Sequence, residues 1–234
     1  MGLLDGKVAL ITAAGGNIAG ATARLFAAEG ALVACLGRAI AIPCDVSDAD
    51  AVRDAVAETV SAFGKITTVF NAAAHSEARH RLADMPVEMW RSVIDVNLTG
   101  MFIVCKFTIP ELQKAGGGSI VNVSSIYGKV AAPERPAYCS SKGGVRMMTR
   151  SIAVDYAEDN IRCNAILPGP IEGPRMLARN PSIAAVVERH GARLHMKRLG
   201  QSSEIARTAL FLASDESSFT SGADLAVDAG YTAF

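Results

Sequence analysis

A tyrosine and a lysine four residues apart form the pair in this sequence with the clearest chemical potential. Tyr138 and Lys142 stand in the segment YCSSK, and on a helix positions i and i+4 lie one above the other on the same face. An isolated tyrosine has a pKa of about 10, and a neighbouring cation lowers it because the cation favours the phenolate. The spacing therefore predicts that Tyr138 can act as a general acid or base.

A serine upstream stands where its hydroxyl would serve the same reaction. Ser125 closely follows the apolar run 119–123, so a strand would deliver its side chain toward the substrate oxygen that Tyr138 reaches. A Tyr-x-x-x-Lys match alone is weak evidence, because most such pairs are exposed residues of a helix. The rest of the chain has to decide whether the pair is catalytic.

The elements that would position these residues alternate along the chain. Residues 8–11 form a continuous apolar run, typical of a parallel strand that is covered on both faces. A glycine-rich turn at 12–20 and a helical stretch at 21–29, closed by Gly30, follow it. Further strands are predicted at 31–36, 39–43, 66–70, 119–123, 161–167 and 223–227, and helices at 48–63 (capped by Ser47), 84–110, 138–157 and 204–213. This alternation predicts an α/β fold with a doubly wound parallel sheet.

One connection conflicts with this pattern. Only Gly37 and Arg38 separate the predicted strands at 31–36 and 39–43, whereas adjacent parallel strands need a crossover of a dozen or more residues, usually a helix. We infer that a segment, the helix between strands 2 and 3, is missing from the sequence. A true deletion that rewires the sheet is the alternative.

These features together resemble the classical short-chain dehydrogenase/reductase family. The family's catalytic set is matched without departure by Asn97, Ser125, Tyr138 and Lys142, and the resemblance covers residues 7–230. It implies that Ser125 positions the substrate oxygen and that Tyr138 passes a proton to or from it while hydride moves to or from the nicotinamide. It also implies that Lys142 lowers the tyrosine pKa and binds the nicotinamide ribose, and that Asn97 holds a water linking Lys142 to solvent.

The glycine-rich turn is the predicted cofactor site, because a turn between a strand and a helix brings backbone amides to a pyrophosphate. Against the family pattern T-G-x-x-x-G-x-G, Thr12 matches, while Ala13, Asn17 and Ala19 stand where glycines are usual. Later in the chain, Gly173 stands where the family commonly has threonine. We therefore expect nucleotide binding to be weakened but retained.

The choice of nucleotide depends on the end of the second strand, where an acid would bind the ribose of NAD and an arginine would accept the 2′-phosphate of NADP. Arg38 has no acid beside it, which favours NADP, with NAD as the alternative. Residues predicted to contact the cofactor are Thr12, Gly15, Gly16, Asn17, Ile18, Arg38, Asp45, Val46, Asn71, Ala72, Ala73, Tyr138, Lys142, Pro168, Gly169 and Ile171.

Composition narrows the range of partners and compartments. The 234-residue chain has a formal net charge of zero and half of its residues are hydrophobic, so one domain (1–234) is expected and neither nucleic acid nor an anionic membrane is favoured. Its apolar runs are far shorter than the ~18 residues of a membrane span, which predicts a cytoplasmic protein. Neither the four histidines nor the five cysteines have metal-ligand spacing, so no metal site is predicted.

The sequence therefore predicts an NAD(P)-dependent oxidoreductase that interconverts a secondary alcohol and a ketone of small or medium size. A basic segment at 173–199 reads as a substrate lid, and Tyr127 and Arg135 are substrate-pocket candidates. The resemblance suggests a homotetramer or homodimer, with the helices that carry Asn97 and Tyr138 at one interface.

Two other functions stay open at this point. The first is a 3-oxoacyl-carrier-protein reductase, in which the basic lid would meet an acidic carrier. The second is a non-catalytic nucleotide-sensing or scaffold protein on the same fold, motivated by the departures in the nucleotide bed, which also include Ala72 and Ala74. The intact catalytic set argues against the second function.

Overall fold

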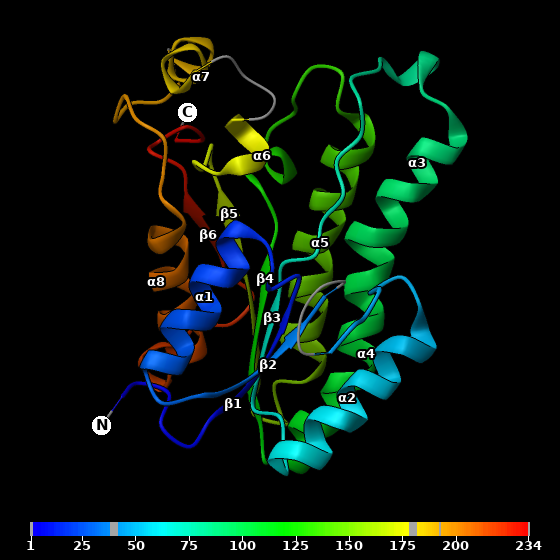
Figure 1. Cartoon of the computed structure of the whole chain (residues 1–234), viewed down its shortest axis with the longest axis vertical. Helices are drawn as coiled ribbons and strands as arrows, with labels where there is room; N and C mark the ends of the chain where they lie inside the picture. The colour runs from blue at the N-terminus through cyan, green and yellow to red at the C-terminus, as the bar shows by residue number, and fades with distance from the viewer. Residues whose placement is uncertain (1, 38–41, 178–181, 192, 234) are drawn as a thin grey trace.

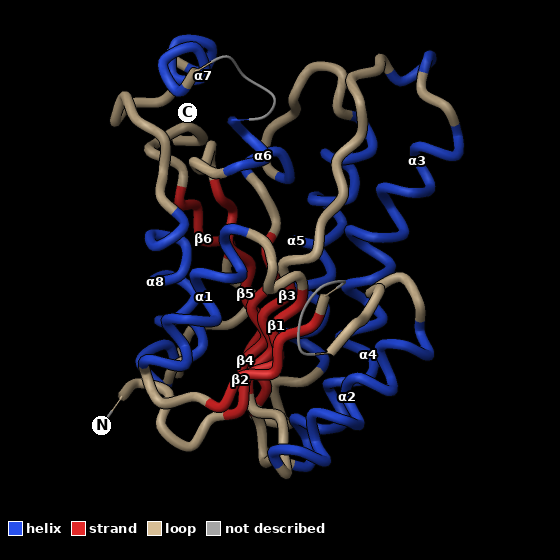
Figure 2. Tube along the Cα trace, viewed as in Figure 1, coloured by secondary structure: helices blue, strands red, loops and turns tan. Residues whose placement is uncertain are grey.

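A parallel sheet forms the centre of the computed structural model, which describes residues 2–37, 42–177, 182–191 and 193–233. In the described residues the sheet has six strands in the order β2-β1-β3-β4-β5-β6, and Figure 2 shows the strands crossing the middle of the molecule. The strands are β1 (Val8–Thr12), β2 (Leu32–Leu36), β3 (Thr68–Asn71), β4 (Gly118–Val123), β5 (Ile161–Pro168) and β6 (Asp224–Val227). The predicted doubly wound parallel sheet is confirmed.

Helices cover both faces of the sheet (Figure 1). One face carries α1 (Asn17–Ala28) and α8 (Ser202–Ala213), and the other carries α2 (Ala49–Phe63), α4 (Gly100–Lys114) and α5 (Pro136–Asp155). Successive residues of β1 point to opposite faces: Leu10 packs in the core on the α2 side, whereas Ala9 and Ile11 pack in the core on the α1 side. A hydrophobic layer therefore covers each face of the sheet, which explains why its strands have continuous apolar runs in the sequence.

The N-terminus of α2 corrects one local prediction. Its N-cap is Asp48 rather than Ser47, because the Asp48 carboxylate accepts hydrogen bonds from the backbone amides of Asp50 and Ala51. Ser47 instead donates its hydroxyl to Asp45. The two candidates differ by one position, which sequence patterns resolve poorly.

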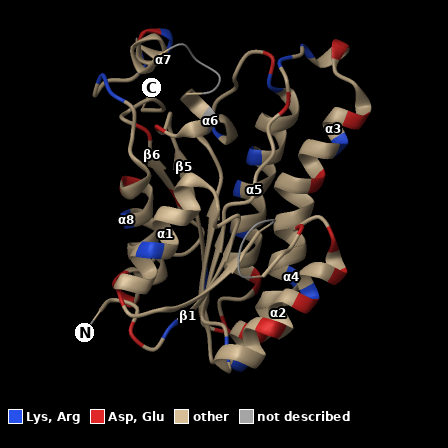
Figure 3. Cartoon of the chain, viewed as in Figure 1, with Lys and Arg blue, Asp and Glu red and all other residues tan. Residues whose placement is uncertain are grey.

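The long helix predicted from residue 84 toward 110 is interrupted. It consists of α3 (Val87–Ile94), a π-helical turn at Asp95–Thr99 and α4. By length and composition the stretch Val87–Lys114 is apolar enough to cross a membrane, but half of its apolar window is buried inside the protein. It is a core helix of this fold, and Figure 3 shows acidic and basic residues interspersed over the helices around it.

The connection after β2 bears on the predicted missing helix. Arg38 and residues 39–41 of the predicted strand 39–43 lie outside the described residues, and Ile42 makes an isolated parallel bridge to Leu36. Because Leu36 also pairs with Thr12 of β1, Ile42 lies along the outer edge of β2. Between β2 and β3 the described residues contain one helix, α2.

The predicted lid segment contains two short helices, α6 (Pro174–Leu177) and α7 (Ile183–His190). Their side chains share a third hydrophobic cluster with the C-terminal tail, in which Val186, Leu194 and Tyr231 are buried. Short helical turns complete the chain: η1 (Leu82–Asp84), η3 (Ile126–Gly128) and η4 (Asp215–Ser217).

Candidate active site

Most of the predicted site residues lie at one edge of the sheet. Thr12, Asn71, Val123 and Pro168 end β1, β3, β4 and β5. Because these strands are parallel, their carboxyl ends meet at the same edge, which is where open α/β sheets bind their ligands. The fold thus gathers residues from four distant parts of the sequence.

Tyr138 and Lys142 lie in the first turns of α5, and the lysine Nζ is 5.8 Å from the centroid of the tyrosine ring. Lys142 is 1% exposed and donates a hydrogen bond of 2.8 Å from Nζ to the Val123 carbonyl. Burial lowers the pKa of Lys142 from 10.5 to about 8, since removal from water disfavours the charged form. The ammonium therefore stays charged near neutral pH.

The end of β4 holds α5 at close range. The Ser124 hydroxyl donates to the Lys142 carbonyl at 2.8 Å, and a Cβ on Gly128 would lie 2.6 Å from that same oxygen. Ser125 is the N-cap of η3, is 7% exposed, and accepts a hydrogen bond from the Tyr127 amide. A glycine at 128 thus lets η3 approach α5, which places Ser125 and Lys142 in adjacent elements.

Asn97 is buried at the centre of the π-helical turn. Its amide group donates to the His75 carbonyl at 2.9 Å and to the Ser141 hydroxyl at 3.1 Å, and its oxygen accepts from the His75 amide at 2.6 Å. The residue thus joins the loop after β3 to α5. A π turn widens the helix and re-aims its side chains, and such turns are common at functional sites.

Glu77, which is not among the predicted site residues, contacts the helix that carries Tyr138 and Lys142. Glu77 is 3% exposed, and its Oε1 accepts a hydrogen bond of 3.1 Å from the Tyr138 amide. The Arg135 guanidinium donates to the Ser76 hydroxyl and the Glu77 carbonyl. The loop 75–77 is therefore fastened to the start of α5, and no sequence pattern marks this lone acid among basic neighbours.

The glycine-rich turn has the geometry that a pyrophosphate site needs. Gly16 is the N-cap of α1 and supplies no side chain to its first turn, so the first-turn amides of the helix face outward at its positive end. Ala13 has φ +55°, a left-handed conformation that costs a residue with a Cβ about 1 kcal/mol or more. A Cβ on Gly20 would lie 2.9 Å from the Ala14 carbonyl. The residues present fit a dinucleotide, with strain where the family has glycine.

Two predicted cofactor-binding side chains near this turn, those of Thr12 and Asn71, make hydrogen bonds within the protein. Thr12 accepts hydrogen bonds from the amides of Ala72 and Ala73, which joins the ends of β1 and β3. Asn71, predicted to contact the cofactor, instead donates its buried amide to Asn122 and to the Cys105 thiol. A gap too narrow for a water molecule is lined by Thr12, Val46, Asn71, Ala73, Met101 and Val104.

The remaining predicted positions are less directly placed. Arg38 lies outside the described residues, and Asp45 accepts hydrogen bonds from the amide and hydroxyl of Ser47. A Cβ added to Gly169 would lie 2.7 Å from the Cα of Asp228. Ile171 makes an isolated parallel β-bridge to Gly200.

Tyr127, a predicted substrate-pocket residue, packs edge-on against Tyr231 with ring centroids 6.4 Å apart. Burial, together with the neighbouring Tyr231, raises the pKa of the Tyr127 phenol, so it stays neutral. The aromatic pair connects η3 to the cluster beneath α7.

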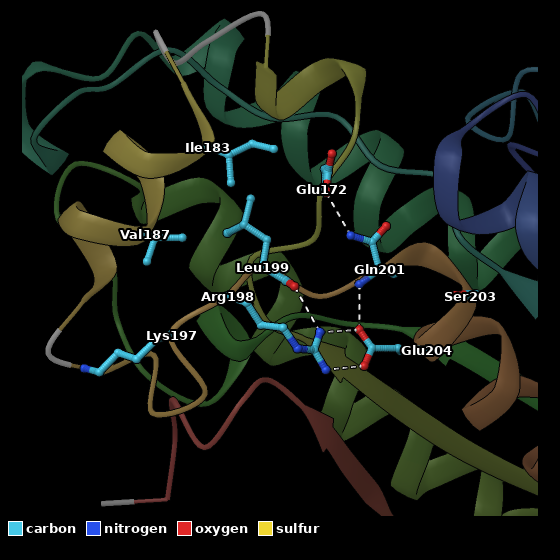
Figure 4. Close-up of a pocket in the computed structure, with 9 residues that line it drawn as sticks. All are labelled: Glu172, Ile183, Val187, Lys197, Arg198, Leu199, Gln201, Ser203 and Glu204. Carbon is cyan, nitrogen blue, oxygen red and sulfur yellow. Dashed lines mark hydrogen bonds and ion pairs between the residues drawn. The ribbon is translucent and has the colours of Figure 1, made fainter.

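A cavity of about 510 Å³ lies between α7 and the start of α8 (Figure 4). None of the four predicted catalytic residues lines it. Among the described residues no three histidine, cysteine or acidic side chains are grouped to hold a metal ion.

Comparisons with known proteins agree with this geometry. The family model described as enoyl-(acyl carrier protein) reductase matches residues 32–232. A 2,5-dichloro-2,5-cyclohexadiene-1,4-diol dehydrogenase from Sphingobium indicum is 35% identical over 247 residues, covering 98% of this chain and 97% of that protein. A 3-oxoacyl-[acyl-carrier-protein] reductase from Thermotoga maritima is 38% identical over 245 residues, covering 97% and 98%.

A solved structure from Burkholderia xenovorans, assigned to the short-chain dehydrogenases/reductases, is 31% identical with a TM-score of 0.94 and covers 100% of this chain and 99% of that one. This chain belongs to the short-chain dehydrogenase/reductase family. As a member of the family it is an NAD(P)-dependent oxidoreductase acting on hydroxyl groups. The alignments with the relatives run longer than the 234 residues of the chain, so these members of the family carry residues that it lacks.

Proposed function

We propose that this enzyme interconverts a small or medium-sized secondary alcohol and the corresponding ketone, with Tyr138 as acid/base and NADP as the preferred cofactor. The observation that carries the proposal is the buried Lys142 ammonium held 5.8 Å from the Tyr138 ring. Relatives named for a cyclohexadiene diol make cyclic alcohols the first substrates to test.

The proposed mechanism assigns one role to each residue. The Ser125 hydroxyl holds the substrate oxygen, and Tyr138 takes its proton during oxidation or supplies one during reduction. The charge of Lys142 stabilises the tyrosinate. The hydrogen bond from the Lys142 Nζ to the Val123 carbonyl orients the ammonium. A bound nicotinamide supplies or accepts the hydride. Asn97 and Glu77 fasten the loop after β3 to α5, which keeps Tyr138 in place.

The cofactor preference rests on Arg38 alone, since a guanidinium fork suits a 2′-phosphate. The α1 N-terminus is proposed to bind the pyrophosphate through the first-turn amides of the helix, since the amides of Ala14 and Gly16 already donate to backbone carbonyls. The segment 173–199 is proposed as a substrate lid, because its cluster with Tyr231 packs against Tyr127, two residues beyond Ser125.

A single-domain, cytoplasmic homo-oligomer is the proposed form of the enzyme. Three large apolar side chains are exposed on helices that cover one face of the sheet: Phe102 on α4, and Met147 and Val154 on α5. Two of them are seven residues apart on α5, so they share one side of that helix. Such unpartnered apolar side chains favour burial against another copy.

Titration with NADPH and NADH, followed by turnover of a panel of cyclic and open-chain ketones, tests the proposal. We expect NADPH to bind more tightly than NADH and Tyr138→Phe to lose at least about 99% of turnover while keeping nucleotide affinity. No binding of either nucleotide at millimolar concentration would contradict the proposal. Full activity of Tyr138→Phe would contradict the role of the tyrosine alone.

A second candidate is reduction of a 3-oxoacyl group on an acidic carrier protein, favoured by the identity to the Thermotoga maritima enzyme. Arg189 on α7 and Arg193 just after it would face such a carrier. Preference for a 3-oxoacyl carrier over free cyclic ketones, lost in Arg193→Gln and at high salt, would favour this function over the first.

A further inference from the structure

Two departures from the family pattern meet in space. Asn17 is the first residue of α1, and Gly173 immediately precedes α6. The Asn17 side chain donates a hydrogen bond of 2.6 Å from Nδ2 to the Glu172 carbonyl. A Cβ added to Gly173 would lie 2.6 Å from that same Nδ2, closer than real Cβ contacts allow. The amide of Asn17 therefore occupies the space that a side chain at 173 would need.

Glu172 is a junction between the turn and the segment that follows β5. Its amide donates to the Gly200 carbonyl at 2.8 Å, and its carboxylate accepts from Gln201 Nε2 at 2.8 Å (Figure 4). The amides of Met176 and Leu177 donate to the Gly173 carbonyl, so α6 begins directly from this junction. Asn17 is thus bonded to the base of the proposed lid.

Further hydrogen bonds extend from Gln201 to residues at the C-terminal end of the lid segment. The Gln201 amide donates to Glu204, whose two carboxylate oxygens accept from Arg198 at 2.9 and 2.7 Å. This ion pair lowers the pKa of Glu204 to about 2, so the carboxylate stays charged throughout the neutral range. Residues on both ends of the segment 172–204 are therefore linked, through Glu172, to one side chain of the nucleotide turn.

We propose that Asn17 is a positioning residue that fastens the lid to the nucleotide turn, and that Asn17 and Gly173 form a matched pair in which the missing side chain at 173 makes room for the amide. The inference rests on the proposed function, because the ligand that the turn would hold is a dinucleotide. A side chain at a position where the family has glycine was expected to weaken nucleotide binding, but one that joins the turn to the base of the lid should instead slow release of a bound nucleotide.

A double-mutant cycle tests this pair, because coupled residues give effects that do not add. We expect Asn17→Gly to raise the NADPH Kd about fivefold or more, through faster dissociation measured by stopped-flow fluorescence. Gly173→Ala should weaken binding similarly, since its Cβ displaces the Asn17 amide. In the Asn17→Gly background, Gly173→Ala should change Kd by less than about twofold, because the clash no longer exists.

Asn160→Gly is the matched control. Its side chain also donates to a backbone carbonyl, that of Gly116, but it precedes β5 at the opposite edge of the sheet. This variant should bind NADPH like the wild type. Unchanged or tighter binding in Asn17→Gly, or equal effects of Gly173→Ala in both backgrounds, would overturn the proposal.

Hydrogen exchange in the nucleotide-free protein separates this inference from the proposed function. Asn17→Gly should speed exchange at the amides of α7, and Asn160→Gly should not. If the wild type binds neither nucleotide, the proposed function fails, yet faster exchange in Asn17→Gly still supports the fastening of the lid. Exchange identical to the wild type contradicts it.

Discussion

Lys142 shows how burial sets the charge state of a single residue. Its side chain crosses from α5 to the end of β4, where its Nζ donates a hydrogen bond to the Val123 carbonyl, and among the described residues no carboxylate pairs with the buried ammonium. Its pKa therefore falls to about 8, against 10.5 for a solvated lysine. Below about pH 8 the folded protein holds a buried charge, which costs stability but supplies the cation beside Tyr138.

Replacing Lys142 by methionine should expose this cost. Between about pH 8 and 10.5 the unfolded chain keeps the lysine proton while the folded protein has lost it, so wild-type stability rises with pH through this window. Relative to Lys142→Met, the free energy of unfolding should rise by up to about 3 kcal/mol across it. Urea unfolding at several pH values measures the difference. Lys106→Met, at an exposed position of α4, is the control variant.

Glu77 holds Tyr138 through a hydrogen bond to the backbone amide of the tyrosine. Glu77→Ala would leave the part-buried Tyr138 amide without its acceptor, whereas Glu77→Gln keeps an oxygen there. We expect kcat to fall roughly 10- to 100-fold in the alanine variant, by displacement of Tyr138, and to fall far less in the glutamine variant. Glu134→Gln, which removes an exposed carboxylate of the neighbouring loop, is the control. Equal losses in both Glu77 variants would show that charge, not position, matters.

At the scale of elements, the site depends on how helices are fastened to strand ends. The π turn at Asp95–Thr99 interrupts the long helix where Asn97 reaches both the His75 backbone and Ser141 of α5. An uninterrupted α-helix was expected because apolar periodicity continues through the segment. One extra residue in a turn does not disturb that periodicity enough to be noticed, although it re-aims the side chain.

Asn97→Ala should therefore be costly for both stability and activity. It removes the side-chain partner of the part-buried His75 amide and carbonyl and of the buried Ser141 hydroxyl, and a polar group left unpaired by burial costs about 1–3 kcal/mol. We expect a loss of about 2–4 kcal/mol in urea unfolding, together with a lower kcat. Ser92→Ala, exposed on α3, should stay within about 0.5 kcal/mol of the wild type. A similar stability for both variants would contradict the fastening role of Asn97.

At the scale of the whole molecule, the distribution of exposed apolar side chains favours self-association. Met147 and Val154 on α5 are 60% and 76% exposed, which is unusual for large apolar residues on a central helix. Both lie on the helix that carries Tyr138 and Lys142. An interface there would stabilise the helix on which the proposed chemistry depends.

Negative charges at Met147 and Val154 should dissociate the proposed homo-oligomer. Met147→Glu combined with Val154→Glu would bury carboxylates in the proposed interface, which is costly without partners. We expect sedimentation velocity to show a smaller species than the wild type at the same concentration. Leu82→Glu changes an exposed leucine on η1, and this variant should sediment like the wild type. An unaltered oligomer in the α5 variant would place the interface elsewhere.

The sequence by itself determined the features that depend on local periodicity and spacing. The alternation of apolar strands and helices predicted the parallel sheet, and the four-residue spacing predicted that Tyr138 and Lys142 share a helix face. The glycine-rich turn predicted a helix after β1, but α1 begins at Asn17, four residues before the predicted start at 21. Such features need only the geometry of one element and its immediate neighbours. The positions of element ends, and the cap of α2 in particular, were predicted less well.

Only the tertiary structure decided which distant residues meet. Glu77 reaches Tyr138 across 61 positions, and Asn17 reaches Glu172 across 155, and both contacts exist because β1, β3, β4 and β5 end at one edge of the sheet. Strand order and loop conformation set these contacts, and neither is recorded in the periodicity of a segment. The predicted chemistry of Tyr138 and Lys142 was thus local, whereas the residues that hold the pair, and those proposed to fasten the lid, emerged only once the chain was folded.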